Sequence, residues 1–363
     1  MVADSLPDDF GNKVIEQWLA SQGKSISDFT AIDRLCYMGK RGMGALEYVP
    51  ATSEFGDIDQ DINVTKMVQF ASDVLNQREA VALNAEEKLT YSQLVQVGSS
   101  AGGARAKALI AWNEATNEIR SGQLNLGKDF DYWLMKFDNV SKNGDHGLED
   151  AKEYTLIEYA YYRMALDAGI EMNECRIYSN NGEHHFMTKR FDRENGKKIH
   201  MQSLGAIAHI SYKEPAICSY EMAAQYMREL NLSMKEMEQF FARMVFNCLA
   251  VNQDDHVKNV SFLMDRTGEW RLSPAYDITF SYNPTNKWLR AHQMSVNGKT
   301  NDISLTDLLE TASKMGIKKG KAMDIVSKIS MVVADFEKYA VEAKIREKTY
   351  SDIQKILIQH RVE

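Results

Sequence analysis

Apolar residues recur at the three-to-four-residue spacing of amphipathic helices over much of the chain. The spacing predicts helices over residues 8–21, 63–79 and 150–168, after Ser233, and from about residue 304 to the end. The third of these is followed by Gly169, a residue type common at helix C-caps, and Ser233 with Glu236 forms a capping-box pattern. Only five prolines interrupt the 363 residues, which allows long helices.

Short aromatic and apolar runs predict strands in the middle of the chain. Residues 130–137 (FDYWLMKF) form one run, and three more lie between residues 175 and 204, separated by turns that contain Asn-Gly. Residues 97–112 (VGSSAGGARAKALIAW) are interpreted as a loop between strands, and residues 139–149 as a surface loop. The fold class is therefore α/β (α+β), with a mixed first half and a helical second half. The predicted parts are a helical N-terminal segment (1–95), a sheet-containing lobe (96–204) and a helical lobe (205–363).

Charge and cysteine content narrow the classes of function. The net charge of −8 argues against non-specific binding of nucleic acid. The four cysteines are far apart in sequence and form no CxxC pair, so a reduced, cytoplasmic compartment is expected. No apolar run approaches 18 residues and the N-terminus lacks a signal-peptide pattern, so no membrane association is expected.

The polar segment 254–259, DDHVKN, has the residue types that phosphoryl transfer needs. Asp254 could orient an attacking hydroxyl and accept its proton, and the side-chain oxygen of Asn259 is a hard ligand that suits Mg²⁺. Asp277 follows eighteen residues after Asn259, beyond a strand and a turn, and suits a second ligand on the same metal. The structural alternative is a polar loop with an Asp that caps a helix.

Two further features could bind nucleotide phosphates. Lys136 lies in an otherwise apolar strand, where a buried ammonium needs a charge partner. Glu158 is the expected partner and Glu153 the rival, while the alternative is a lysine at a strand end that reaches solvent. The small residues of segment 99–107 (SSAGGARAK) would let backbone N–H groups approach phosphates, although an ordinary flexible turn has the same composition.

Taken together, these segments resemble the HipA-like serine/threonine kinases, which are toxins of bacterial toxin–antitoxin modules. The resemblance spans nearly the whole chain and is carried by SSAGGARAK (99–107), WLMKF (133–137), TKRFDR (188–193), NQDDHVKN (252–259) and SPAYDI (273–278). It implies a two-lobed protein-kinase-like fold that binds ATP between its lobes and uses Mg²⁺.

The resemblance also implies a role for each matched residue. The catalytic set is Asp254, Lys136 and His256, of which His256 suits packing and hydrogen bonding better than a role as base. The metal ligands are Asn259 and Asp277. The nucleotide-binding set is Ser100, Ala101, Gly102, Gly103, Ala104, Arg105, Lys107, Lys136, Glu158 and Lys258. Ser100, with Ser99 as the alternative, matches the serine whose autophosphorylation expels the loop and silences the kinase.

The implied substrate is a protein hydroxyl on an aminoacyl-tRNA synthetase or another translation factor. The implied partner is a HipB-like DNA-binding antitoxin, through which alone the chain would contact DNA. Two rival functions remain open. One is a small-molecule phosphotransferase with the same metal loop, and the other is a catalytically silent module that binds an antitoxin.

Two features depart from the family pattern. The LPDDFG segment begins at Leu6, so the β-rich subdomain that precedes it in relatives is expected to be missing, and a small separate protein is a further candidate partner. The phosphate loop reads AGGARAK where the best-known members have a Gly-Ala-Gln-Glu-Lys run. Arg105 is therefore expected either to add a phosphate contact or to face solvent.

Overall fold

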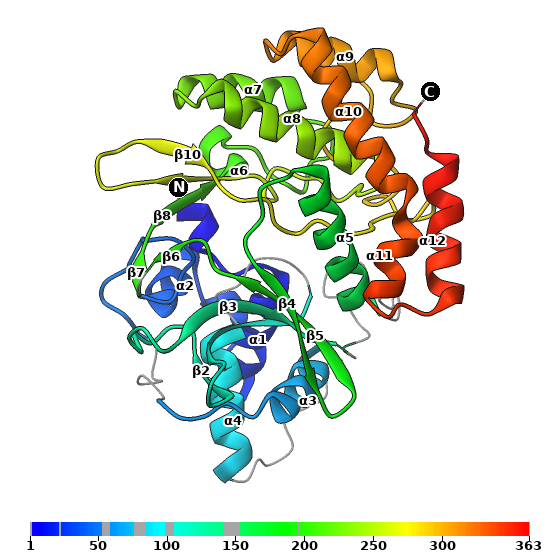
Figure 1. The fold of residues 1–363 in the computed structure, drawn as a ribbon. Helices are drawn as coiled ribbons and strands as arrows, with labels where there is room; N and C mark the ends of the chain where they lie inside the picture. Colours follow the sequence, from blue (N-terminus) through cyan, green and yellow to red (C-terminus); the bar gives the residue numbers. More distant parts are fainter. Residues whose placement is uncertain are drawn as a thin grey trace. The chain divides into compact units, whose positions relative to one another are not determined.

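The computed structural model describes residues 2–21, 23–52, 59–75, 85–98, 105–138, 140, 153–194 and 196–362. The chain forms two compact units (Figure 1). The first unit comprises residues 1–155 and 174–201, and the second comprises residues 156–173 and 202–363. The expected N-terminal segment 1–95 is thus part of the same unit as the sheet, and most of the helix predicted over 150–168 belongs to the second unit.

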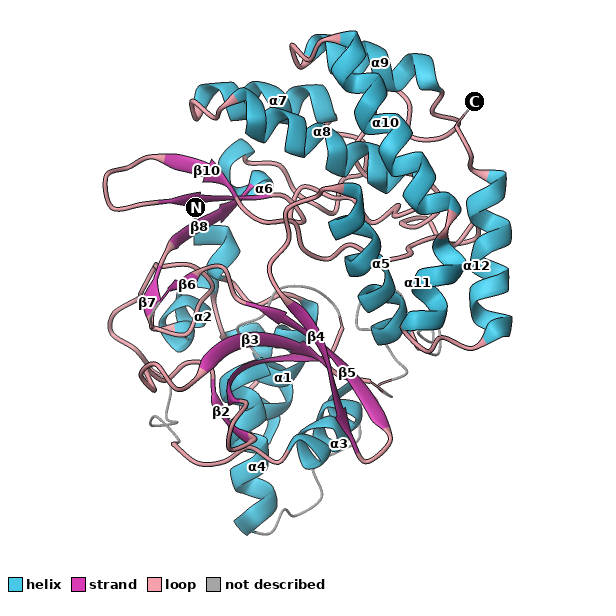
Figure 2. Ribbon diagram, viewed as in Figure 1, coloured by secondary structure: helices cyan, strands magenta, loops and turns pink. Residues whose placement is uncertain are grey.

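The first unit is built on a five-stranded antiparallel sheet with the order β2-β1-β3-β5-β4 (Figure 2). Its strands are β1 (Lys107–Asn113), β2 (Glu118–Ser121), β3 (Asp131–Lys136), β4 (Cys175–Asn180) and β5 (Glu183–Lys189). The strand predicted over 130–137 is confirmed as β3. β4 and β5 form a hairpin in which Asn181 and Gly182 take positive φ values of 50° and 82°, as an Asn-Gly turn requires.

Helices cover one face of this sheet. They are α1 (Asp9–Ser21), η2 (Ile26–Asp28), α2 (Ala31–Met38), α3 (Val64–Leu75) and α4 (Ala85–Gly98), while the short helix η1 (Val2–Ser5) begins the same unit. The shared core joins Phe10 and Val14 of α1, Met67 of α3 and Leu94 of α4 to Ala108, Ile110, Trp133 and Met135 of the sheet. Because side chains alternate along a strand, Lys107 and Lys136 point to the opposite face.

Two expectations for the first unit were wrong in detail. α4 continues to Gly98, so the glycine-bearing segment that follows connects a helix to β1, and not one strand to another. The single strand expected over KKIHMQSL is broken into β7 (Lys197–Lys198) and β8 (His200–Ser203). β7 pairs with β6 (Arg193–Glu194), while β8 joins the small sheet of the second unit, so the break lets the chain pass from one sheet to another.

The second unit is mainly helical. Its helices are α5 (Tyr154–Ala168, with residues from Leu156 in this unit), α6 (Leu204–Ala208), α7 (Tyr220–Glu229), α8 (Met234–Leu249), α9 (Leu305–Lys314), α10 (Lys319–Ala334), α11 (Phe336–Glu342) and α12 (Glu347–Gln359). β9 (Ser261–Met264) and β10 (Trp270–Leu272) complete the three-stranded sheet with β8. No helix among the described residues is long and apolar enough to cross a membrane.

Local signals in the sequence set the ends of these helices. The predicted capping box is confirmed, since the Ser233 side chain accepts from the Glu236 backbone and the Glu236 side chain accepts from the Ser233 backbone. Gly169 follows α5 with φ +88°, a conformation that favours glycine. The predicted start near residue 304 is also confirmed, because Ser304 caps α9.

Candidate functional site

The segment DDHVKN follows α8 after four residues, and strand-like hydrogen bonds hold the chain just before the segment. After the C-cap of α8 at Ala250, the backbone turns at Val251, whose φ is +54°. The Gln253 N–H donates to the Ser281 carbonyl at 2.9 Å, and the Ser281 N–H donates to the Val251 carbonyl at 3.1 Å. The chain therefore enters residues 254–259, hereafter the catalytic-loop candidate, in an extended conformation.

Burial alternates residue by residue along this loop. Gln253, Asp255 and Val257 are buried, whereas Asp254, His256 and Lys258 are partly exposed. The Asp254 side chain is 40% exposed. The predicted base is thus accessible to an acceptor hydroxyl, while its neighbours on either side anchor the loop.

Asn259 folds back onto the start of the loop. Its side-chain Nδ2 donates to the Asp254 carbonyl at 2.8 Å, and its backbone N–H donates to the His256 carbonyl at 2.9 Å. Since the amide nitrogen is used in this way, the Oδ1 atom is the one that remains suited to a metal ion.

Asp277 is tied to the same region by the residue before it. The Tyr276 hydroxyl donates to the Lys258 carbonyl at 2.6 Å and also contacts the Ser261 hydroxyl. Tyr276 precedes Asp277 and Lys258 precedes Asn259, so this bond brings the segments of both predicted metal ligands together. Asp277 has φ +56°, a left-handed conformation that is uncommon outside glycine and occurs at functional sites.

The donor set of this region fits Mg²⁺. It offers a carboxylate on Asp277 and an amide oxygen on Asn259, both hard oxygen ligands, and Mg²⁺ commonly keeps several waters besides such groups. Within the described residues, no cluster of three or more His, Cys, Asp or Glu side chains could hold a metal. Mg²⁺ held by Asn259 and Asp277 would take its remaining ligands from nucleotide phosphates and water.

His256 and Lys258 both contact Tyr212, a residue that the sequence alone did not indicate. The His256 ring lies 5.4 Å from the Tyr212 ring, and the Lys258 Nζ lies 4.9 Å from that ring's centroid. His256 Nε2 is 3.9 Å from Asp254 Oδ1, which is too long for a hydrogen bond, and its buried Nδ1 has no partner among the described residues. These contacts favour packing over a role as base for His256.

The first unit contains a second group of predicted site residues. Lys107 on β1 and Lys136 on β3 are direct cross-strand partners, so their side chains leave the same face of the sheet. Both are buried, with residue exposures of 4% and 5%, and the Lys136 Nζ lies 5.9 Å from the Phe186 ring centroid. Their side chains thus share one face of the sheet, and each also interacts with a further group of the structure.

Arg105 packs on an aromatic ring just before β1. Its guanidinium lies 4.5 Å from the centroid of the Tyr154 ring, and the Tyr154 hydroxyl donates to the Phe137 carbonyl. This cation–π contact fixes Arg105 at the start of β1. Ser99, Ser100, Ala101, Gly102, Gly103 and Ala104 lie outside the described residues, as do all residues except Val140 of the loop predicted over 139–149.

The predicted partner of Lys136 is Glu158, on α5 in the second unit. Glu158 is buried, whereas the rival Glu153 is only partly buried and precedes α5 with φ +71°. Burial therefore favours Glu158 as the functional carboxylate, and its pairing with Lys136 stays a prediction.

The TKRFDR segment builds a buried ion cluster in the first unit. Arg190 donates to Asp192 through Nε and Nη2, each at 2.8 Å, and Arg193 Nη1 donates to Asp192 at 2.7 Å. The Gly44 N–H also donates to Asp192 at 2.7 Å, and Arg193 binds the Gly42 and Gly44 carbonyls. The cluster fastens the segment after α2 to the end of β5, which is a structural role.

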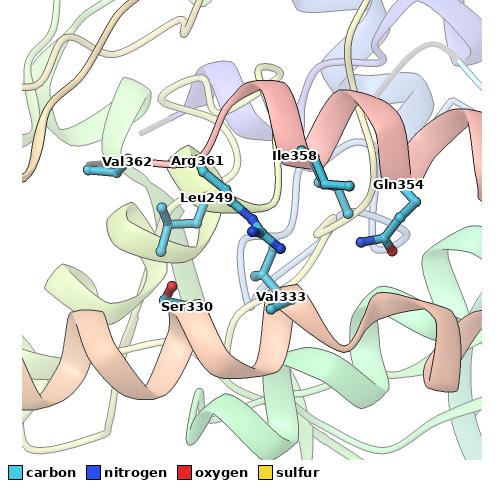
Figure 3. A pocket seen from close by; sticks show the side chains of 9 residues that line it. Leu249, Ser330, Val333, Gln354, Ile358, Arg361 and Val362 are labelled. Carbon is cyan, nitrogen blue, oxygen red and sulfur yellow. The ribbon is translucent and has the colours of Figure 1, made fainter.

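A small hollow in the second unit is not large enough to bind a nucleotide. Its walls include Leu249 of α8, Val333 of α10, and Gln354 and Ile358 of α12 (Figure 3). It has room for about one or two water molecules.

Comparisons with known proteins identify the family of the chain and its fold. Residues 99–336 match the family described as HipA-like C-terminal domain, and residues 1–49 match the HipA N-terminal domain, so at least part of that domain is in the chain. A solved structure of HipA from Shewanella oneidensis MR-1, in a complex with HipB and operator DNA, has a TM-score of 0.70 with 16% identity. That similarity covers 95% of this chain and 80% of the other, and it confirms the predicted two-lobed fold.

A curated relative from Haemophilus influenzae is described as a putative kinase. It is 27% identical over 160 residues, which are 39% of this chain and 47% of the relative. The chain thus matches about half the length of this relative.

Proposed function

Since this chain belongs to the HipA-like family, we propose that it is an ATP-dependent serine/threonine protein kinase that acts as the toxin of a toxin–antitoxin pair. The observation that carries the proposal is the bond from the Tyr276 hydroxyl to the Lys258 carbonyl. It joins the segment of Asp277 to the loop that presents Asp254 and Asn259, so the base and two oxygen ligands share one region of the second unit.

Each side chain has a distinct part in the proposed reaction. Asp254 orients the acceptor hydroxyl and accepts its proton. The acceptor oxygen bonds to the γ-phosphorus, the bond from that phosphorus to the β–γ bridging oxygen breaks, and ADP leaves. Asn259 and Asp277 would hold Mg²⁺, which when bound neutralises charge on the phosphate oxygens.

The lysine pair supplies the phosphate-binding cations. Lys136 and Lys107 would bind phosphate oxygens of ATP, and their positions on one sheet face support this role. Arg105 and segment 99–104 precede β1, at the end of the strand where Lys107 lies. The nucleotide-binding function of that segment follows from the family resemblance, as does a phosphate contact for Lys258.

The proposed substrate is a serine or threonine of an aminoacyl-tRNA synthetase or another translation factor in the cytoplasm. The similar HipA structure contains HipB and operator DNA, which supports a HipB-like antitoxin as partner. Co-purification from the native host would test this partner, because a lone species would count against it.

The decisive experiment compares wild type with Asp254→Asn. Labelled ATP, Mg²⁺ and a host lysate should give a phosphorylated band with wild type and none with the variant, while ATP binding persists in both. A silent binding module would label nothing. A small-molecule phosphotransferase would consume ATP when given a mixture of metabolites without protein. It would leave the proteins of the lysate unlabelled.

We also propose autophosphorylation on Ser100, or on Ser99. An added phosphate carries about −1.5 to −2 charges at pH 7 and would repel the phosphates of ATP. Wild type should gain about 80 Da during prolonged incubation with Mg–ATP and lose activity, because one phosphoryl group has that mass. Ser100→Ala should keep its activity, unless Ser99 is the modified residue, which Ser99→Ala would show. A wild type that labels its substrate without gaining mass would refute the proposal.

A further inference from the structure

Asp255 is the most deeply buried polar residue of the catalytic-loop candidate. Its residue exposure is 2%, and its side chain is fully buried, whereas the Asp254 side chain beside it is 40% exposed. A carboxylate removed from water in this way is costly unless several donors compensate it. A side chain that points inward between two outward-pointing neighbours can fix where those neighbours lie.

Three donors converge on Asp255. The Tyr220 hydroxyl donates to Oδ2 at 2.8 Å, and His292 Nδ1 lies 2.9 Å from the same oxygen. The Gln293 backbone N–H donates to Oδ1 at 2.7 Å. Both carboxylate oxygens are therefore held, and the side chain cannot rotate without losing a bond.

These donors belong to different parts of the second unit. Tyr220 is the first residue of α7, and its hydroxyl also accepts from Asn247 Nδ2, on the last turns of α8, at 3.0 Å. His292 and Gln293 lie in the segment before α9. Asp255 thus connects the loop to α7, to the helix that delivers the loop, and to a segment 37 residues further along the chain.

Two groups close to Asp255 have a raised pKa. Burial raises the pKa of the Tyr220 hydroxyl, and the nearby Asp255 raises it further. The pKa of the Cys248 thiol is raised by the same two causes. Both groups therefore stay neutral beside the carboxylate, and Tyr220 remains a hydrogen-bond donor.

The geometry points to Asp255 as a positioning residue that holds Asp254 and His256 at the acceptor side of the loop. The inference rests on the proposed kinase function, because Asp254 matters only if phosphoryl transfer occurs. It concerns the placement of the base, and no bond to ATP or to the acceptor is assigned to Asp255. Misplacement of a catalytic group by about 1 Å can lower a rate by about 100-fold.

The test separates positioning from general stability by using a matched carboxylate. Asp307, also buried in this unit, accepts from Lys299 Nζ, the Ser304 N–H and Asn297 Nδ2 at 2.8–3.0 Å, and has no bond to the loop. Asp255→Asn and Asp307→Asn are compared for phosphate release from Mg–ATP, for ATP affinity by calorimetry, and for Tm. All rates are measured below the Tm of the less stable variant.

We expect Asp255→Asn to lower kcat by about 100-fold while the Kd for ATP changes by less than about threefold. Asp307→Asn should keep kcat within about threefold of wild type, even if its Tm falls as far as that of Asp255→Asn. If Asp255→Asn does not fold, Tyr220→Phe removes one donor without changing the ring, and should lower kcat by about tenfold with ATP affinity unchanged.

Two results would overturn the inference. One is an Asp255→Asn or Tyr220→Phe protein with near-normal kcat, and the other is an equal loss of kcat in Asp307→Asn at equal loss of Tm. Failure of the proposed function looks different, because wild type itself would then release no phosphate, and the positioning role would fall with it.

Discussion

Lys107 and Lys136 lie directly opposite one another on β1 and β3, and both side chains are buried on the face of the sheet that the helices of the first unit leave uncovered. Like charges at opposite cross-strand positions destabilise a sheet. Both lysines also interact with further groups of the protein, and the proposed function adds ATP phosphates to these contacts.

The first prediction concerns this pair. Lys136→Met should raise the Kd for ATP by about tenfold or more, since one direct contact to a charged group contributes on the order of 1.5–3 kcal/mol. Lys107→Met should raise the Kd for ATP less. The double variant should lose less binding free energy than the two single variants together, because both cations contact the same ligand. Lys189→Met, on β5 and paired with the exposed Asp131, is the control on the same sheet. Equal losses of affinity in all three variants would contradict the prediction.

The second prediction concerns the metal ligands. Asp277→Asn should raise the Mg²⁺ concentration needed for half-maximal phosphate release by about tenfold or more, because it removes a charged hard ligand. Asparagine is the suitable replacement, since it tolerates the positive φ of this position, whereas alanine would add backbone strain. Asp265→Asn, in the exposed turn between β9 and β10, is the control. An unchanged Mg²⁺ dependence in Asp277→Asn would remove this residue from the metal site.

Features set by neighbours in sequence could be predicted. The Ser233 capping box, the Gly169 helix end and the Asn181-Gly182 turn depend on residues within a few positions of one another, and all three are present. The extended loop after α8 also follows from its polar run.

Features that depend on distant residues could not be predicted. Asp255 binds His292 and Gln293, and no local pattern identifies partners 37 and 38 residues away. The pairing of Lys107 with Lys136 required the register of two strands. Tyr212 contacts the loop from a segment that carries no motif of its own. For Lys136 and Glu158, only the residue types and the burial could be anticipated.

The third prediction concerns the Asp192 cluster. Burial alone would raise the pKa of Asp192, but the Arg190 and Arg193 guanidinium groups outweigh burial, so this pKa lies well below its usual range. Asp192→Ala leaves two buried cations without their shared carboxylate. It should lower the free energy of unfolding by about 3–5 kcal/mol, measured by urea denaturation of the whole chain.

The control for Asp192→Ala is Asp131→Ala, which breaks the exposed pair with Lys189. It should lower the free energy of unfolding by less than about 1 kcal/mol. Similar losses in both variants would show that the buried cluster contributes no more than a surface ion pair.

The last prediction uses His185, whose side chain is fully buried. Its Nδ1 accepts from the Asp138 N–H at 3.0 Å, and the ring contacts Phe137 and Tyr178. Burial lowers the pKa of His185 to about 4, although Asp138 opposes the shift. The folded state therefore holds this ring neutral, whereas an unfolded chain would protonate it below about pH 6.5.

Because the folded pKa is depressed, the stabilising contribution is complete above about pH 6.5 and is lost as the pH falls toward 4. The loss should reach about 3 kcal/mol over that window. His185→Gln keeps a hydrogen-bond acceptor but cannot titrate, so its free energy of unfolding should fall less steeply between pH 7 and 4.5 than that of wild type. His184→Gln, at a partly exposed position on the same strand, should change the profile less than His185→Gln does, because the charge of His184 is only a lesser cause of the lowered His185 pKa. Parallel pH profiles for wild type and His185→Gln would mean that His185 does not set the acid sensitivity of the first unit.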